Sequence, residues 1–294
     1  MYTIRTVVKM TGVPAHTIRA WERRFALFDP ARSDTNRRLY TEDEVEHLRL
    51  LQAAIARGHT IGQLSKLDVP RLRELVQAPP AQLPSSATTL DQCKRAVLEL
   101  APEALEIALR RALMESGANA MIEKTIIPLV HWIGECWREG LVSISQEHMA
   151  SAAIRSVLHS MLASIPRASA GPTIVLTTLP GEEHELGLLI VGVIAAAKGW
   201  NPIMMGANMP VSEIAAAARA TGARAIGLSL VNRTDESDLV GYLRQLRESI
   251  GERLAVMVGG TEASIHAATL TAFGVLIARD LASTEAALSA ATRL

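Results

Sequence analysis

The chain has 294 residues, 49% of them hydrophobic, and its 30 Lys and Arg balance its 30 Asp and Glu. This length suits two or three domains with ample core, and the composition excludes a disordered protein. Cys93 and Cys136 are too few for a disulfide framework, and no signal segment or long apolar run indicates a membrane. We therefore expect a soluble cytoplasmic protein.

The N-terminal part is the basic part of the chain. Residues 1–78 hold 13 of the basic residues but only 9 of the acidic ones, which points toward nucleic acid. A short helix over residues 3–10 is broken at Gly12, and Pro14 opens a second helix that runs to about Phe25. Two short helices around a glycine turn predict a helix-turn-helix.

The second helix has a polar face that could lie in a major groove. Its polar residues are His16, Thr17, Arg19, Arg23 and Arg24. A turn-rich basic segment over residues 29–40 follows and indicates a wing. Thr41 then caps a third helix, with Glu44 completing a capping box, and the helix continues to about Gly58.

This order of elements resembles the DNA-binding domain of MerR-type regulators over roughly residues 1–75. The resemblance rests on three motifs, which are Trp-Glu-Arg-Arg-Phe at 21–25, Arg-Leu-Tyr at 38–40 and Thr-x-x-Glu at 41–44. It implies binding to double-stranded operator DNA, with phosphates held by Arg19, Arg38 and Tyr40. His16 and Thr17 would lie nearer to base edges, and Arg23 is a further candidate contact. A solvated surface charge is the alternative for any one arginine.

The middle of the chain is almost entirely helix-forming. Residues 76–88 are typical of a linker. Residues 89–166 follow, with breaks near Pro102, Gly117 and Gly140 that predict a four-helix bundle. Here Trp137 is followed after nine residues by a Glu-His pair, Glu147 and His148. Taken alone, these residues suit a core tryptophan and a polar helix start.

Residues 172–294 alternate strand-like and helix-like segments, which predicts a doubly wound parallel sheet of the Rossmann-like class. Strands are expected at 173–177, 202–205, 225–230, 255–258 and 275–277, and helices at 188–197, 212–221, 238–250 and 263–273. The whole chain is thus a multidomain α and α/β protein. We interpret Cys93 and Cys136 as helix-packing thiols.

His184 lies in a loop at the carboxyl end of the first predicted strand, where open α/β sheets bind ligands. It could be a metal ligand or a loop histidine that only bonds backbone. Gly187 would let another surface approach the start of the next helix. Ser229 and the pair Gly259-Gly260 close two other strands at the same sheet end, although a strand cap or a tight turn would explain each alone.

The segment Glu182-x-His184-x-x-Gly187 resembles the cobalamin-binding motif Asp/Glu-x-His-x-x-Gly. The resemblance implies that His184 is the lower axial ligand of cobalt and that Glu182 holds the imidazole N–H. It also implies a slot for the displaced benzimidazole tail, lined by Ser229, Val231, Gly259 and Gly260. Valine at 231 replaces the usual leucine and should keep the slot apolar.

The Trp-x9-Glu-His signature resembles the helical cap of CarH-like light-dependent regulators. It implies that Trp137, Glu147 and His148 shelter the adenosyl group of adenosylcobalamin. Arg138 departs from these light sensors, which can place a histidine after the tryptophan, and a guanidinium cannot ligate cobalt. Water, His131, His148 and loss of the cofactor all remain open for the lit state.

Together these features predict a light-responsive, adenosylcobalamin-dependent transcriptional repressor, and no enzyme. It would assemble from dimers into tetramers on DNA in the dark and leave DNA after photolysis of the cobalt–carbon bond. One alternative is a sensor of cobalamin supply without photochemistry, or one with another chromophore. The other is a corrinoid carrier subunit of a methyltransferase.

Overall fold

The computed structural model describes residues 1–28, 30–33, 36–55, 61–77, 88–251 and 254–293. They form two compact units, Met1–Ala153 and Ile154–Leu294. Among the described residues, no helix is both long and apolar enough to cross a membrane. The predicted helix end at Gly58 and most of the predicted linker, residues 78–87, lie outside the described residues.

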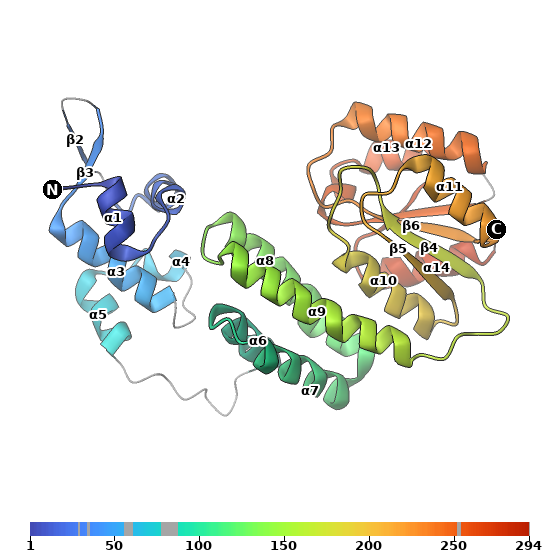
Figure 1. The fold of residues 1–294 in the computed structure, drawn as a ribbon, viewed down its shortest axis with the longest axis horizontal. Coiled ribbons are helices and arrows are strands. Elements are labelled where there is room, and N and C mark those ends of the chain that lie inside the picture. Colours follow the sequence, from blue (N-terminus) through green and yellow to red (C-terminus); the bar gives the residue numbers. More distant parts are fainter. Residues whose placement is uncertain (29, 34–35, 56–60, 78–87, 252–253, 294) are drawn as a thin grey trace. The chain divides into compact units, whose positions relative to one another are not determined.

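The first unit begins with the predicted helix-turn-helix and its wing (Figure 1). Its elements are β1 (Tyr2–Thr3), α1 (Ile4–Thr11), α2 (Ala15–Phe25), β2 (Ala31–Arg32), β3 (Arg38–Tyr40), α3 (Glu42–Ile55), α4 (Ile61–Leu64) and α5 (Val69–Gln77). Gly12 ends α1 with φ 74°, a left-handed conformation that suits glycine. The predicted capping box of α3 is present, because the Thr41 backbone N–H donates to Glu44 at 2.7 Å and the Glu44 N–H donates to the Thr41 hydroxyl at 3.2 Å. Strand β1 pairs with β3 beside the wing, a pairing that the sequence did not reveal.

The helical bundle follows in the same unit. Its elements are α6 (Thr89–Leu98), α7 (Pro102–Met121), the π-helical turn η1 (Ile122–Ile126), α8 (Ile127–Arg138) and α9 (Ile144–Ser164), the last of which continues into the second unit. The three predicted breaks are confirmed: Pro102 starts α7, Gly117 interrupts it with φ 77° and ψ 171°, and Gly140 lies between α8 and α9. Burial raises the pKa of the Cys93 and Cys136 thiols to about 12, which agrees with packing thiols.

The second unit contains the predicted doubly wound sheet, which is confirmed. Its elements are β4 (Thr173–Thr178), α10 (Leu186–Ala197), β5 (Asn201–Gly206), α11 (Val211–Ala220), β6 (Ala225–Ser229), α12 (Glu236–Ile250), β7 (Ala255–Gly259), the 3₁₀ turn η2 (Thr261–Ser264), α13 (Ala267–Ala272), β8 (Leu276–Ala278) and α14 (Leu281–Ala291). The five strands are parallel in the order β5-β4-β6-β7-β8. Figure 1 shows α10 and α14 on one face of the sheet and α11, α12 and α13 on the other.

The structure corrects one predicted helix and adds one that was not predicted. The single helix expected over residues 263–273 is divided into η2 and α13. The first turn is held by the residue that follows β6, because the Glu262 backbone N–H donates to the Leu230 carbonyl at 3.1 Å. The sequence analysis also missed α14, whose start is marked by a capping box between Asp280 and Ser283.

The carboxyl ends of four strands form one row across the sheet. The parallel register aligns Thr178 of β4 with Ser229 of β6, Ser229 with Gly259 of β7, and Gly259 with Ala278 of β8. Gly260 comes next and has φ 106°, and a Cβ there would lie 2.2 Å from the Leu230 carbonyl oxygen. Only glycine therefore lets the loops after β6 and β7 approach this closely.

Replacing Gly260 with alanine should destabilise the sheet domain by about 2 kcal/mol or more, because backbone strain and a backbone clash coincide. Urea unfolding followed by circular dichroism measures the change. Gly222→Ala is the matched control, since φ is 61° there and an added Cβ would meet no described atom within 4 Å. Equal destabilisation by the two variants would show that the clash with Leu230 contributes nothing.

Candidate functional site

A buried carboxylate organises the loop that follows β4. The Glu182 side chain is 3% exposed. Its Oε2 accepts backbone hydrogen bonds from Val231 at 2.8 Å and Asn232 at 2.6 Å, both in the loop after β6. Its Oε1 accepts from the backbone N–H of His184 at 2.9 Å and from the Asn232 side chain at 3.3 Å. One side chain thus ties together two loops at the carboxyl end of the sheet.

The Glu182 carboxyl is strongly acidic despite its burial. Burial acts to raise its pKa, but the hydrogen bonds from the His184 side chain and from the backbone of Asn232, His184 and Val231 outweigh it and lower the pKa to about 2. The side chain is therefore a carboxylate at neutral pH. A buried negative charge of this kind is stable only where several donors surround it.

The imidazole of His184 is oriented by this carboxylate. Its Nδ1 lies 2.6 Å from Oε1 of Glu182, and the side chain is 54% exposed. The predicted contact between Glu182 and the imidazole is therefore present. The arrangement matches that of metal-binding histidines, in which one ring nitrogen is held by a carboxylate and the other faces the metal.

Asn208 supports the same loop from β5, and the sequence analysis did not identify it. It has φ 56°, its Oδ1 accepts from the Gly181 backbone at 2.8 Å, and its Nδ2 donates to Glu183 at 3.1 Å. Its own backbone N–H donates to the Thr178 hydroxyl at 2.7 Å. The one local signal was an asparagine in a loop, since asparagine tolerates a positive φ.

The predicted slot residues are brought together around the same row of strand ends. Ser229 is buried, and a Cβ added at Gly187 would lie 3.5 Å from the Ser229 hydroxyl, so the first turn of α10 lies close to the end of β6. Val231 donates to Glu182 through its backbone. Gly259 ends β7, and Gly260 contacts Leu230 as described above.

The residues predicted to cap the cofactor lie in the first unit, near the connection between α8 and α9. Trp137 is 52% exposed although it is a large apolar side chain, and Ile144 across the connection is 63% exposed. Glu147 accepts from the Ser151 hydroxyl at 2.7 Å and lies 2.9 Å from Nδ1 of His148. Trp137 thus presents apolar surface to solvent, and the alternative that it is a core tryptophan is wrong.

A second buried carboxylate, Glu22 of α2, holds the wing of the helix-turn-helix. The Tyr40 hydroxyl donates to its Oε1 at 2.6 Å, and Arg38 Nε lies 3.0 Å from its Oε2. Glu22 is 8% exposed, and Tyr40 is buried. Arg38 and Tyr40, which were both predicted to hold DNA phosphates, thus pair with a carboxylate of α2 in this structure.

The remaining predicted DNA contacts divide into two groups. His16, Arg19 and Arg23 are exposed on α2, as a DNA-contacting face requires. Thr17 is buried at 1% exposure, so in this structure it faces the protein interior rather than solvent. The sequence could not separate the two groups, because neighbouring helix positions differ only in the direction of their side chains.

Comparison with known families assigns domains to three parts of the chain. Residues 2–68 match the MerR HTH family of regulatory proteins. Residues 172–288 match a B12 binding domain, and residues 89–160 match a second B12 binding domain family. The chain therefore combines a MerR HTH domain with two segments that match B12-binding domain families, as the sequence motifs predicted.

Individual proteins are similar to this chain in sequence or in part of the fold. The chain is 29% identical over 276 residues to the HTH-type transcriptional repressor CarH of Myxococcus xanthus, covering 91% of each protein. It is 28% identical to the HTH-type transcriptional repressor CarA of the same organism, covering 92% of this chain and 90% of that one. The structure of the Methanosarcina barkeri monomethylamine corrinoid protein matches 69% of this chain and 98% of that chain, with a TM-score of 0.57 and 17% identity, which concerns the fold alone.

Alkaline pH should destabilise the helix-turn-helix through Tyr40. Burial and the hydrogen bond to Glu22 raise the pKa of Tyr40 well above its ordinary value of 10.0. Its contribution to stability is therefore complete below pH 10.0 and is lost as the pH rises further. Thermal unfolding at increasing pH should show this loss in the wild type and not in Tyr40→Phe. Tyr242→Phe is the control. If Tyr40→Phe kept the same pH dependence as the wild type, the loss of stability could not be assigned to ionisation of Tyr40.

Glu182→Gln should destabilise the sheet domain by about 2–3 kcal/mol, because the amide places a donor where the backbone of Val231, Asn232 or His184 donates. Glu183→Gln is the matched control, since that exposed side chain has one described hydrogen bond, to Asn208. We expect it to change stability by less than about 0.5 kcal/mol. Urea unfolding of both variants measures the difference. If Glu182→Gln leaves the free energy of unfolding unchanged, the negative charge is not needed to hold the two loops together.

Proposed function

We propose that this protein is a transcriptional repressor that holds operator DNA when adenosylcobalamin is bound and releases it in light. The support is the combination of a MerR HTH domain with B12-binding domains, and the similarity to two transcriptional repressors over nine tenths of the chain. The observation that carries the cobalamin part is the buried Glu182 carboxylate at Nδ1 of His184.

The sheet domain would hold the cofactor through His184. Because Glu182 holds Nδ1, Nε2 would be the nitrogen that ligates cobalt, and the carboxylate would make the imidazole more basic toward the metal. The slot for the tail of the cofactor would be lined by Ser229, Val231, Gly259 and Gly260, and Gly187 would let the cofactor approach the start of α10 closely. The close approach of Gly187 to Ser229 fits such a slot, because larger side chains there would fill it.

The helical bundle would cover the other side of the cofactor. Trp137, Glu147 and His148 would contact the upper group, and Trp137 offers the exposed apolar surface that such a contact needs. When bound, adenosylcobalamin supplies a cobalt–carbon bond that light can break. Trp137 would then lose its contact with the upper group, and α8 and α9 would move relative to the sheet domain.

This movement would control assembly on DNA. Dimers joined into tetramers would engage several helix-turn-helix domains at once, which can raise avidity by about two to four orders of magnitude. His16, Arg19 and Arg23 would contact DNA from α2. Arg38 and Tyr40 would contact phosphates from the wing if they exchange Glu22 for DNA, and Thr17 would have to become accessible.

The test is size-exclusion chromatography with inline absorbance, on protein loaded with adenosylcobalamin in the dark and run again after green illumination. We expect corrin absorbance to co-elute with a large species that shrinks with light, and a gel shift on operator DNA that is lost in parallel. His184→Ala should lose co-elution, whereas His159→Ala, an exposed histidine of α9, should retain it. No corrin binding by the wild type would refute the assignment of His184.

Other outcomes would support the two alternative functions. Corrin binding with a size and a DNA affinity that light does not change would support a sensor of cobalamin supply. Arg138 favours this alternative, because a guanidinium cannot ligate cobalt. The Nε of Arg138 donates to the Gly134 carbonyl of the same helix at 3.2 Å. Preference for methylcobalamin without specific DNA binding would support a corrinoid carrier.

A further inference from the structure

One face of α7 in the bundle carries an exposed apolar stripe. Ile107 and Met114 lie on α7 and are 67% and 81% exposed, and Leu100, two residues before the helix, is 49% exposed. Leu100 has φ 52° and lies in the turn before α7, so the stripe on the helix itself consists of Ile107 and Met114, which are seven residues apart. The opposite face of α7 is buried and includes Leu105, Ala108, Leu109 and Ala112. The helix therefore has two apolar faces, of which the bundle core uses one.

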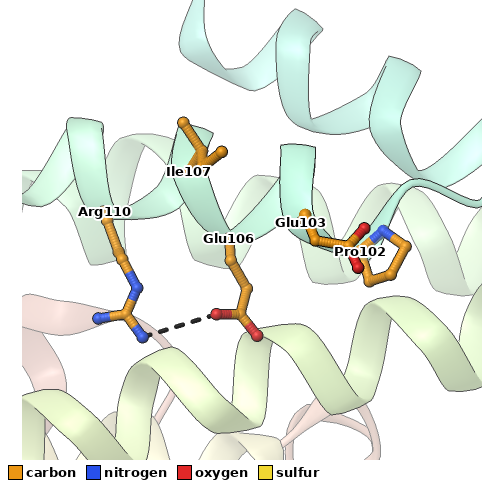
Figure 2. Close-up of a pocket in the computed structure, with 5 residues that line it drawn as sticks. All are labelled: Pro102, Glu103, Glu106, Ile107 and Arg110. Carbon is orange, nitrogen blue, oxygen red and sulfur yellow. Dashed lines mark ion pairs between the residues drawn. The ribbon is translucent and has the colours of Figure 1, made fainter.

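The exposed face also contains a hollow of the shape that helix pairing uses. The hollow has a volume of about 270 Å³ and is lined by Pro102, Glu103, Glu106, Ile107 and Arg110. Figure 2 shows Ile107 on one side of it and the Glu106–Arg110 ion pair, at 3.6 Å, on the other. Four of these residues stand at positions i, i+3, i+4 and i+7, which is the set that receives a side chain from a facing helix in knobs-into-holes packing.

The charges on this face are arranged for antiparallel self-association. Glu103 and Glu106 precede Ile107, and Arg110, Arg111 and Glu115 follow it. Within α7, Arg110 pairs with Glu106 at 3.6 Å and Arg111 pairs with Glu115 at 2.6 Å, whereas Glu103 has no ion pair among the described residues. If two copies cross antiparallel at Ile107, Glu103 of each copy lies opposite Arg110 of the other. In a parallel pairing, like charges would face each other instead. The interface would be isologous, with the same patch on both subunits.

We propose that the α7 face of residues 100–114 is a homotypic interface that binds the same face of a second copy, antiparallel, with Ile107 at the two-fold axis. One pair of helices buries less than the roughly 1,000 Å² of a stable interface, so this contact is weak by itself. It adds to any other contact between subunits and requires no cobalamin. It therefore does not depend on the function proposed above.

Cysteine cross-linking of the full-length apo-protein tests the geometry. With diamide as oxidant, Ile107→Cys should give a covalent dimer on a non-reducing gel, because the two-fold axis places residue 107 beside its own copy. Met114→Cys is the matched control. It is more exposed, but its symmetry mate would lie about 20 Å away at 1.5 Å rise per residue, beyond the reach of a disulfide. Cys93 and Cys136 are buried, and the wild type controls for them.

Charge reversal tests the orientation. Glu103→Arg in the Ile107→Cys protein should slow cross-linking about tenfold, since two ion pairs become two like-charge pairs. Unchanged circular dichroism would show that the bundle remains folded. Cross-linking of Met114→Cys as fast as of Ile107→Cys, no dimer from Ile107→Cys, or no effect of Glu103→Arg would each overturn the proposal. Because no cobalamin is present, these results are separate from the light and DNA tests.

Discussion

The carboxylate of Glu182 is the interaction on which the loops of the proposed cofactor site depend. It is buried and yet ionised, because backbone and side-chain donors from two loops converge on it. Those donors can reach it only if β4 and β6 are neighbours and end at the same height, which the parallel register provides. The register of the sheet thus positions Glu182, and the Glu182 carboxylate in turn orients the exposed imidazole of His184.

The helix-turn-helix uses the same physical device for a different purpose. Glu22 is a nearly buried carboxylate that joins the recognition helix α2 to the wing through Arg38 and Tyr40. In both domains the acidic residue accepts hydrogen bonds from two segments of the chain and so holds these segments in one geometry. The residues proposed to contact cobalamin or DNA lie on these segments. In each case their positions therefore depend on a carboxylate with little exposure to solvent.

Much of the fold could be predicted from local sequence, because local signals determined it. The capping box of Thr41 and Glu44 marked the start of α3, and the apolar runs of the second unit marked all five strands of its sheet. The predictions failed where a short element has no periodic pattern, as in β1, or where a distant contact controls the backbone. The division between η2 and α13 is of the second kind, since the hydrogen bond from Glu262 to Leu230 holds the first turn.

The sequence by itself determined the order of elements, the strand ends and the pair Glu182 and His184, because these depend on spacing within a few residues. Tertiary structure decided which groups surround Glu182, since Asn232 lies 50 positions away in the chain. It also decided that Thr17 and Tyr40 are buried whereas Trp137 and Ile107 are exposed. Periodicity shows that a helix has an apolar face, but only packing shows whether another element covers that face.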